Sequence, residues 1–403
     1  MSAPHWSDLW AAFGRIGLLS FGGPAAQIAV MRAELVERRG WLDEEGFLRG
    51  LAFCTLLPGP EAMQLATYAG WRMRGTAGGV LAGLLFVLPG AALMMALAAV
   101  YLAYGRLPAV EAAFEGVKAA VLAIVLAALV KLWRTVAGTR ADLLVAGAAF
   151  AALLAGLPFW AVLIAAGLAG LLFAPGAAEG ATLGAAPAGG GTARVVAVWI
   201  AVWWTPLLVV IALAPGSAPA EAALFFSWLA TVSFGGAYAV LAALSQTAVE
   251  GYGWLTKAQM IDGLGLAETT PGPLILVTTF AAWLGGAAAG GWPMALATAA
   301  TGLWATFAPC FLFVLAGAPH VERLTAMPRV RYALRGITAA VLGVIAALAL
   351  WFGRAVLWDG GVDGVAVGLA AISGAWLLIL KRGLVETLAL AAALALVWHW
   401  VVG

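Results

Sequence analysis

Two short motifs that break helices occur twice in this chain and could together bind an anion. The copies are Ser20-Phe21-Gly22-Gly23 with Pro58-Gly59-Pro60, and Ser233-Phe234-Gly235-Gly236 with Pro271-Gly272-Pro273, displaced by 213 residues. Proline is favoured in the first turn of a helix, so Pro24, Pro60 and Pro273 are predicted to start helices. The unpaired N–H groups there carry about half a positive charge and bind anions without Lys or Arg. Four converging ends suit a tetrahedral dianion, although Ala237 replaces the proline at the fourth.

Polar side chains beside these breaks are further candidates to contact a substrate. With the motif residues they complete the predicted substrate-binding set: Gln27 after Pro24, Gln64, Thr67 and Tyr68 after Pro60, Tyr238 in the second copy, and Thr269 and Thr270 before Pro271. Gln64 and Tyr68, four residues apart, share one helix face. Each side chain could instead bond a neighbouring backbone, and the breaks could be simple kinks.

Two carboxylates, Glu61 and Glu268, flank the Pro-Gly-Pro turns. Carboxylates at membrane depth are unfavourable and usually functional, and beside an anion they repel it unless protonated. We therefore predict a role in proton coupling, with complementation of a helix N-terminus as the alternative for Glu61. They are not repeat counterparts, because Glu61 aligns with Leu274 and Glu268 with Thr55. Arg15 and Lys118 could supply positive charge, snorkel, or pair with a carboxylate such as Glu115.

The composition excludes a soluble domain. Of 403 residues, 64% are hydrophobic and 10% charged, whereas soluble domains have about 25% charged residues. Apolar runs of twenty or more residues recur, which predicts an all-α polytopic membrane protein in the lipid bilayer. A net charge of +2 without charge blocks gives no basis for a nucleic-acid partner.

Cofactor chemistry has little support. Cys54 and Cys310 are far apart in apolar segments, and the histidines His5, His320 and His399 are scattered. There is no phosphate-binding GxxxxGK[ST] loop, so ATP is not the predicted energy source. We expect no metal, no cofactor and no enzyme activity.

The duplication extends over nearly the whole chain. We predict a first repeat at 1–174, a linker with one transmembrane span at 175–220, and a second repeat at 221–403. The expected elements are residues 9–36, 47–71, 75–104, 110–133 and 143–173, then 195–213, then 222–249, 260–285, 292–316, 330–352, 362–380 and 384–402. The stretch 143–173 would be about 46 Å long as one helix, so a break at Leu157-Pro158 should give two. About 13 elements place the second repeat in inverted topology, with 285–291 as a Gly-rich loop.

The charged loops predict the orientation. Most Lys and Arg lie in loops on the N-terminal side, which favours a cytoplasmic N-terminus and an outside C-terminus. Arg32, Arg38 and Arg39 contradict this pattern. They agree with it if the first two interrupted elements dip into the membrane and return, and this alternative stays open.

Three motifs resemble a known family. Residues 57–71 (LPGPEAMQLATYAGW), 263–274 (GLGLAETTPGPL) and 231–241 (TVSFGGAYAVL) are similar to the signatures of the long-chain chromate transporters, which have two fused repeats. The departures at Met63 and Ala69 are mild. The resemblance implies export of chromate from the bacterial cytoplasm through the inner membrane, driven by the proton gradient or membrane potential, and hence chromate resistance. It assigns the Phe-Gly-Gly and Pro-Gly-Pro turns, with the polar residues after them, to the site.

Other functions remain as alternatives at this stage. Another oxyanion such as sulfate has the same shape and charge as chromate, and an uncoupled anion channel would need no gradient. A membrane-bound reductase would need a redox site that these motifs lack. A homodimer is an open alternative for the assembly.

Overall fold

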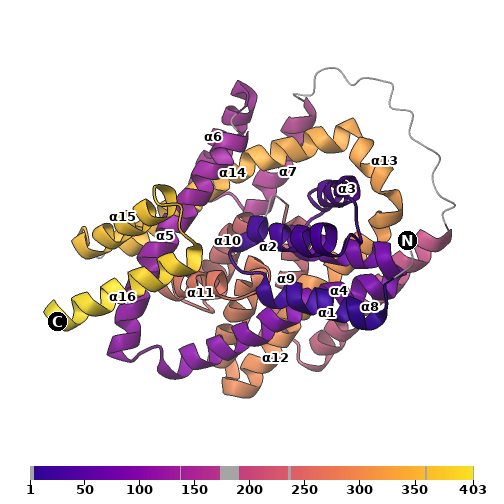
Figure 1. Cartoon of the computed structure of the whole chain (residues 1–403). Helices are drawn as coiled ribbons and strands as arrows, with labels where there is room; N and C mark the ends of the chain where they lie inside the picture. Colours follow the sequence, from indigo (N-terminus) through magenta and orange to yellow (C-terminus); the bar gives the residue numbers. More distant parts are fainter. Residues whose placement is uncertain (1–3, 137, 173–189, 235–236, 359–360, 403) are drawn as a thin grey trace.

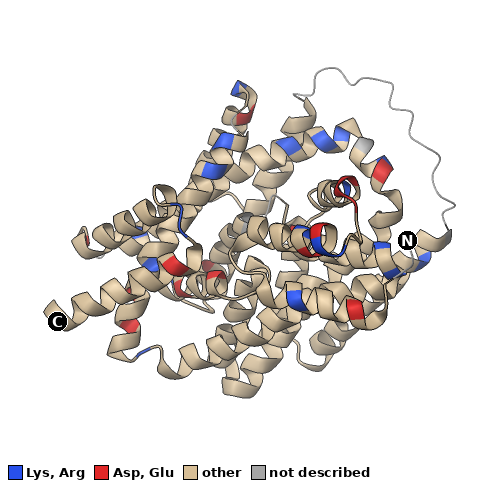
Figure 2. Cartoon of the chain, viewed as in Figure 1, with Lys and Arg blue, Asp and Glu red and all other residues tan. Residues whose placement is uncertain are grey.

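The computed structural model describes residues 4–136, 138–172, 190–234, 237–358 and 361–402, and every named element in them is a helix (Figure 1). This confirms the all-α fold class. Within these described ranges, six helices are long and apolar enough to cross a membrane. Figure 2 shows long stretches of helix without charge. Residues 175–189 of the predicted linker, and Gly235 and Gly236, lie outside the described residues.

The helices occur in the same order in both halves. The first half consists of α1 (Trp6–Leu19), α2 (Gly23–Arg32), α3 (Glu44–Cys54), α4 (Glu61–Tyr104), α5 (Pro108–Val136), α6 (Arg140–Leu154) and α7 (Phe159–Leu172). After α8 (Gly190–Leu213), the second consists of α9 (Ala218–Val232), α10 (Ala237–Leu244), α11 (Lys257–Thr269), α12 (Val277–Gly317), α14 (Pro328–Leu357), α15 (Gly364–Leu378) and α16 (Leu384–Val402). The break between α6 and α7 at Leu157-Pro158 is confirmed.

Short irregular helices also recur or connect the longer ones. The π-helices η1 (Ala33–Arg38) and η2 (Ser245–Gly251) follow α2 and α10 at equivalent places. The second half adds η3 (Leu274–Leu276), η4 (Ala318–His320) and α13 (Val321–Ala326). Neither π-helix is predicted by apolar periodicity, which does not distinguish a π-turn from an α-turn.

Both α4 and α12 are helical hairpins with tight turns. Their backbones leave helical φ/ψ only at Arg74 and Gly75, and at Gly290 and Gly291. In α4, Gly70 lies against the carbonyl of Gly78, a contact with no room for a side chain. The prediction that 285–291 form a Gly-rich loop is therefore wrong for most of these residues. They are helical, and only Gly290 and Gly291 form the turn.

The chain also reverses at each helix break. Arg15 Nε lies 3.7 Å from Glu34 Oε2, although one continuous helix would separate these residues by roughly 28 Å. The Phe225 and Tyr252 rings, on either side of the second break, are 5.8 Å apart. Phe53 and Tyr68 likewise meet at 5.8 Å across Pro58-Gly59-Pro60. These contacts favour the alternative in which the interrupted elements dip in and return.

The two halves exchange their C-terminal helices. Helices α6 and α7 pack on α14 of the second half, while α15 and α16 pack on α5 of the first (Figure 1). The helix backbones touch here, because Gly336 faces the Ala166 carbonyl and Gly116 faces the Ala391 carbonyl. Arg335 also donates to Asp142 at 2.8 Å, joining α14 to α6. Each half therefore completes its packing with helices from the other.

Replacing Gly336 with valine should destabilise this exchange. Its Cβ would overlap the Ala166 carbonyl and lie 2.9 Å from the Gly170 backbone. Overpacking of this kind typically costs about 1–3 kcal/mol, so the melting temperature of the purified protein in detergent should fall by several degrees. The control is Gly374→Val in α15, where an added Cβ meets nothing within 4 Å. Equal melting temperatures for the two variants would contradict the packing of α7 on α14.

Candidate functional site

The predicted breaks form the tips of the helical hairpins. Helix α2 begins at Gly23 with Pro24 in its first turn, and α4 begins at Glu61 directly after Pro60. In the second half η3 begins directly after Pro273, and α10 begins at Ala237. Gly22, Gly23, Gly59 and Gly272 have φ of 84°, 82°, 117° and 93°. These left-handed values are tolerated mainly by glycine.

Tips from opposite halves are joined by reciprocal backbone hydrogen bonds. Gly272 N donates to the carbonyl of Ser20 at 2.8 Å, and Gly59 N donates to that of Ser233 at 3.0 Å. Ser20 and Ser233 are buried. The residues of one bond correspond to those of the other after a shift of 213 positions. A pseudo-two-fold axis therefore relates the two bonds. The motifs that the sequence places far apart are thus brought together in the structure.

Two buried amide side chains form hydrogen bonds to the tips. Neither has an amide at its repeat-equivalent position. Gln27 Nε2 donates to the Gly272 carbonyl at 2.6 Å, and Gln64 Nε2 donates to the Pro58 carbonyl at 2.6 Å. Because these acceptors are carbonyls, the amide nitrogen must face them in both side chains. The Oε1 atoms of Gln27 and Gln64 are buried without a partner in the described chain. Unpaired polar atoms of this kind are unfavourable in a protein core.

Two residues at equivalent places let α4 and α12 approach the tips. Gly90 faces the carbonyl of Pro271, with no room for a side chain. At the repeat-equivalent position Cys310 fills the space beside Gly59, 2.9 Å from where a Cβ on that glycine would lie. Neither was predicted as a site residue. The alignment of Pro89 with Pro309 was the available signal, since it aligns Gly90 with Cys310.

The predicted hydroxyl side chains donate to their own helices. Each bonds a carbonyl three or four residues earlier: Ser20 to Ile16, Thr67 to Met63, Ser233 to Ala230, Thr269 to Leu266 and Thr270 to Ala267. Tyr68 packs its ring on Phe53, Trp71 and Gly50. Phe21 is 39% exposed and Phe234 is half-buried. In this conformation these five hydroxyl donors are occupied by bonds within the protein.

The two predicted carboxylates have different surroundings. Glu61 is the first residue of α4 and is partly buried, so its charge lies at the positive end of that helix. Glu268 is buried in α11 and accepts a hydrogen bond of 3.0 Å from Tyr238 Oη. Its Oε2 atom has no partner in the described chain. The structure thus joins Tyr238 of one hairpin to Glu268 of the next.

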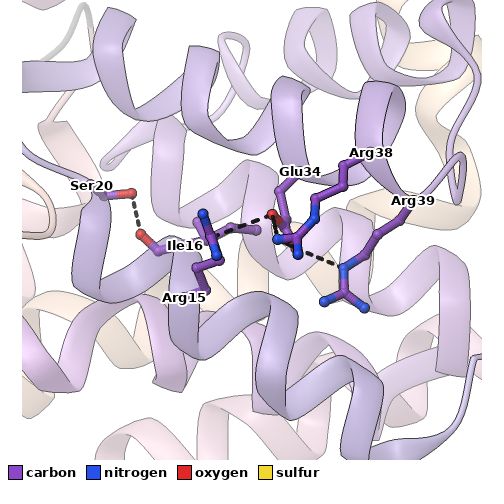
Figure 3. Close-up of polar contacts among 6 residues, drawn as sticks. All are labelled: Arg15, Ile16, Ser20, Glu34, Arg38 and Arg39. Carbon is purple, nitrogen blue, oxygen red and sulfur yellow. Dashed lines mark hydrogen bonds and ion pairs between the residues drawn. The ribbon is translucent and has the colours of Figure 1, made fainter.

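A cationic cluster lies beside the first break (Figure 3). Arg39 Nε, Arg38 Nη1 and Arg15 Nε lie 2.7, 3.0 and 3.7 Å from the Glu34 carboxylate. Three positive charges therefore surround one negative charge, and Arg15 and Arg38 are each 56% exposed. The sequence indicates Arg15 as a source of charge but does not place Arg38 and Arg39 near it, because that contact requires the chain reversal.

Other features of the described residues lie apart from the tips. A cavity of about 440 Å³ opens where η2 faces α6 and α14, with Glu250, Lys257 and Arg354 in its lining, and no residue of the break motifs borders it. The described residues contain no cluster of His, Cys, Asp or Glu that could hold a metal ion. The tips are packed against one another in this conformation, so a ligand there would have to separate them.

Comparison with known proteins connects this architecture to transport. A family described as chromate transporter matches residues 7–171 and 220–399. The chain is 31% identical over 364 residues to a probable chromate transport protein of Synechococcus elongatus, covering 90% of this chain and 88% of that one. It is 32% identical over 345 residues to a chromate transport protein of Pseudomonas aeruginosa, covering 85% and 80%. No solved structure matches the chain.

Alanine at the glycine tips should destabilise the site. Gly59→Ala would force φ of 117° on an L-residue and bring its Cβ within 2.8 Å of Gln64 Nε2. Gly272→Ala would impose φ of 93°. Strained backbone of this kind costs about 1–3 kcal/mol, measurable as lower thermal stability in detergent. The control is Gly14→Ala in α1, which has open space. Wild-type stability of both tip variants would disprove the left-handed turns.

Proposed function

The chain belongs to the chromate transporter family, and we propose that it exports chromate from the bacterial cytoplasm across the inner membrane, giving chromate resistance. The observation that carries this proposal is the pair of reciprocal contacts between hairpin tips of opposite halves. Discontinuous helices that meet at the interface of two repeats are the typical substrate site of secondary transporters. The described residues offer no alternative metal centre.

In our proposal the substrate binds between the tips. Chromate is a tetrahedral dianion, so its oxygens can accept hydrogen bonds from the N–H groups at the starts of α2, α4, α10 and η3. Binding would replace the bonds from Gly272 to Ser20 and from Gly59 to Ser233 with bonds to the anion. The breaking and remaking of these bonds would let the hairpins separate on one side and then on the other. We propose that the residues of the duplicated motifs bind the anion.

The membrane potential is a sufficient driving force for export. Moving two negative charges out of a negative cytoplasm releases about 4.6 kcal/mol per 100 mV. An ionised Glu61 would oppose binding of a dianion at the start of α4, and a proton on Glu61 would remove that repulsion. We therefore propose that proton uptake by Glu61 or Glu268 accompanies chromate binding, so that the pH modifies a process driven mainly by the potential.

The re-entrant hairpins support a cytoplasmic N-terminus. If each hairpin enters and returns, Arg32, Arg38 and Arg39 lie on the same side as the N-terminus, in agreement with the positive-inside rule. The cluster of Arg15, Arg38 and Arg39 around Glu34 would then attract chromate on the cytoplasmic side. Fields of this kind raise the local concentration of an anion and its rate of association.

Chromate uptake into inside-out vesicles tests the transport proposal. The vesicle interior is positive, so labelled chromate should accumulate, and collapse of the potential with valinomycin and potassium should abolish accumulation. Nigericin, which removes the pH gradient, should leave accumulation in place, because the potential is the main driving force. Excess sulfate measures selectivity, since the two anions have the same shape and charge. Uptake that is unchanged after both gradients are collapsed would indicate an uncoupled channel.

Glu61→Gln should separate binding from pH response. Glutamine is neutral like the protonated acid, so chromate affinity at high pH should be kept or increased, while transport should depend less on the proton gradient. The matched control is Glu386→Gln, which removes an exposed glutamate from the first turn of α16. Affinity comes from equilibrium binding to purified protein. Lost binding with a normal pH response would assign Glu61 to the substrate site instead.

A further inference from the structure

A second buried carboxylate lies on the same helix as Glu268. Asp262 in α11 is 4% exposed, and its Oδ2 atom accepts a hydrogen bond of 2.7 Å from Tyr101 Oη. Its Oδ1 atom is buried without a partner in the described chain. Glu268 repeats this arrangement six residues later, with Tyr238 as the donor and Oε2 unpaired. Nothing in the sequence motifs indicates Asp262, because its repeat counterpart is Arg49.

The residues around Asp262 restrict the position of the Tyr101 ring. The Tyr101 ring makes edge contacts with Phe114 of α5 and Phe280 of α12, each at 5.2 Å between centroids. Gly265, three residues after Asp262, is packed against Val117 of α5. Tyr101 therefore has little freedom to rotate, and its hydroxyl is held toward Asp262. The pair is enclosed by α4, α5, α11 and α12.

Charged residues of α5 lie near this pair. Lys118 of α5 is 15% exposed and donates to Glu115, which is 60% exposed, at 2.6 Å. Lys118 and Glu115 both act electrostatically on Asp262, and Glu111, also on α5, acts on Tyr101. Lys118 follows Phe114 by four residues and so shares the helix face that contacts Tyr101. For Glu268 the facing titratable group is Tyr238 of α10.

We propose that Asp262 is a proton-binding site of the transport cycle, which gives α11 two such sites, and this inference rests on the proposed transport function. A buried ionised carboxylate with a single hydrogen bond is strongly disfavoured, whereas a carboxylic acid needs far less stabilisation. A proton on Oδ1 occupies the unpaired position while the site is closed. When α11 is exposed to water during transport, the proton can leave to water, and the positive charge of Lys118 can then stabilise the ionised carboxylate. Proton loss and helix movement are then linked.

The opposing hypothesis is that Asp262 is a permanently ionised counter-ion of Lys118. Two measurements separate the two hypotheses. Infrared spectroscopy of the purified protein detects the C=O stretch of a protonated carboxyl group and needs no chromate. Asp262→Asn should remove one such band, whereas Asp363→Asn, which changes an exposed N-cap of α15, should not. No loss of a band in Asp262→Asn would overturn the inference.

Transport in proteoliposomes gives the second measurement. Asp262→Asn should keep potential-driven chromate flux. The ratio of its transport rates at pH 6 and pH 8 should be nearer to one than the wild-type ratio, by a factor of at least about three. Tyr101→Phe should shift the pH profile without abolishing it. If Asp262→Asn instead unfolds and Lys118→Gln restores it, the carboxylate is a structural counter-ion. If wild-type protein moves no chromate but shows the infrared band, the proposed function fails while the proton site stands.

Discussion

The structure depends on one constraint, that backbone N–H and C=O groups released at a helix break must find partners where water is scarce. At the tips these partners come from the other half of the chain, as Gly272 N bonds the Ser20 carbonyl and Gly59 N bonds the Ser233 carbonyl. The amides of Gly59 and Gly272 thus depend on the half of the chain to which they do not belong. The exchange of α6 and α7 for α15 and α16 has the same consequence at the periphery, because each half packs on helices of the other. The two repeats therefore form a single folding unit.

The same constraint gives the tips their functional potential. Hydrogen bonds between two backbones hold the hairpins together only until another acceptor of comparable strength replaces the carbonyls, and an oxyanion is such an acceptor. The approach of α4 and α12 is close because Gly90 and Cys310 are small. Few side-chain donors are free there, since the neighbouring hydroxyls bond their own helices. A site built mainly from backbone can change conformation without moving a buried charge.

The sequence was informative wherever local chemistry decides the structure. Proline predicted helix starts at Pro24 and Pro60, and the helices begin at Gly23 and Glu61. Length arithmetic predicted the break before Phe159. Features that need distant segments to meet were not predictable. The contact of Arg15 with Glu34 requires the reversal at Gly22, and the Tyr101–Asp262 bond joins residues that are 161 positions apart. The helical continuation through 285–289 was missed because glycine lowers helix propensity, while close packing of the hairpin outweighs it.

The symmetry of the backbone does not extend to its ionisable side chains. The first half carries the arginine cluster and Glu61, whereas the equivalent positions of Arg15, Glu34 and Glu61 are Trp228, Thr247 and Leu274. The second half carries Asp262 and Glu268, which correspond to Arg49 and Thr55. Two exactly equivalent halves would make the inward-open and outward-open states equal in energy. Cations on one half and buried acids on the other make these states respond differently to an anion, a proton and the membrane potential. In the proposed cycle the duplicated backbone would supply two related conformations, and the unequal side chains would make their energies differ.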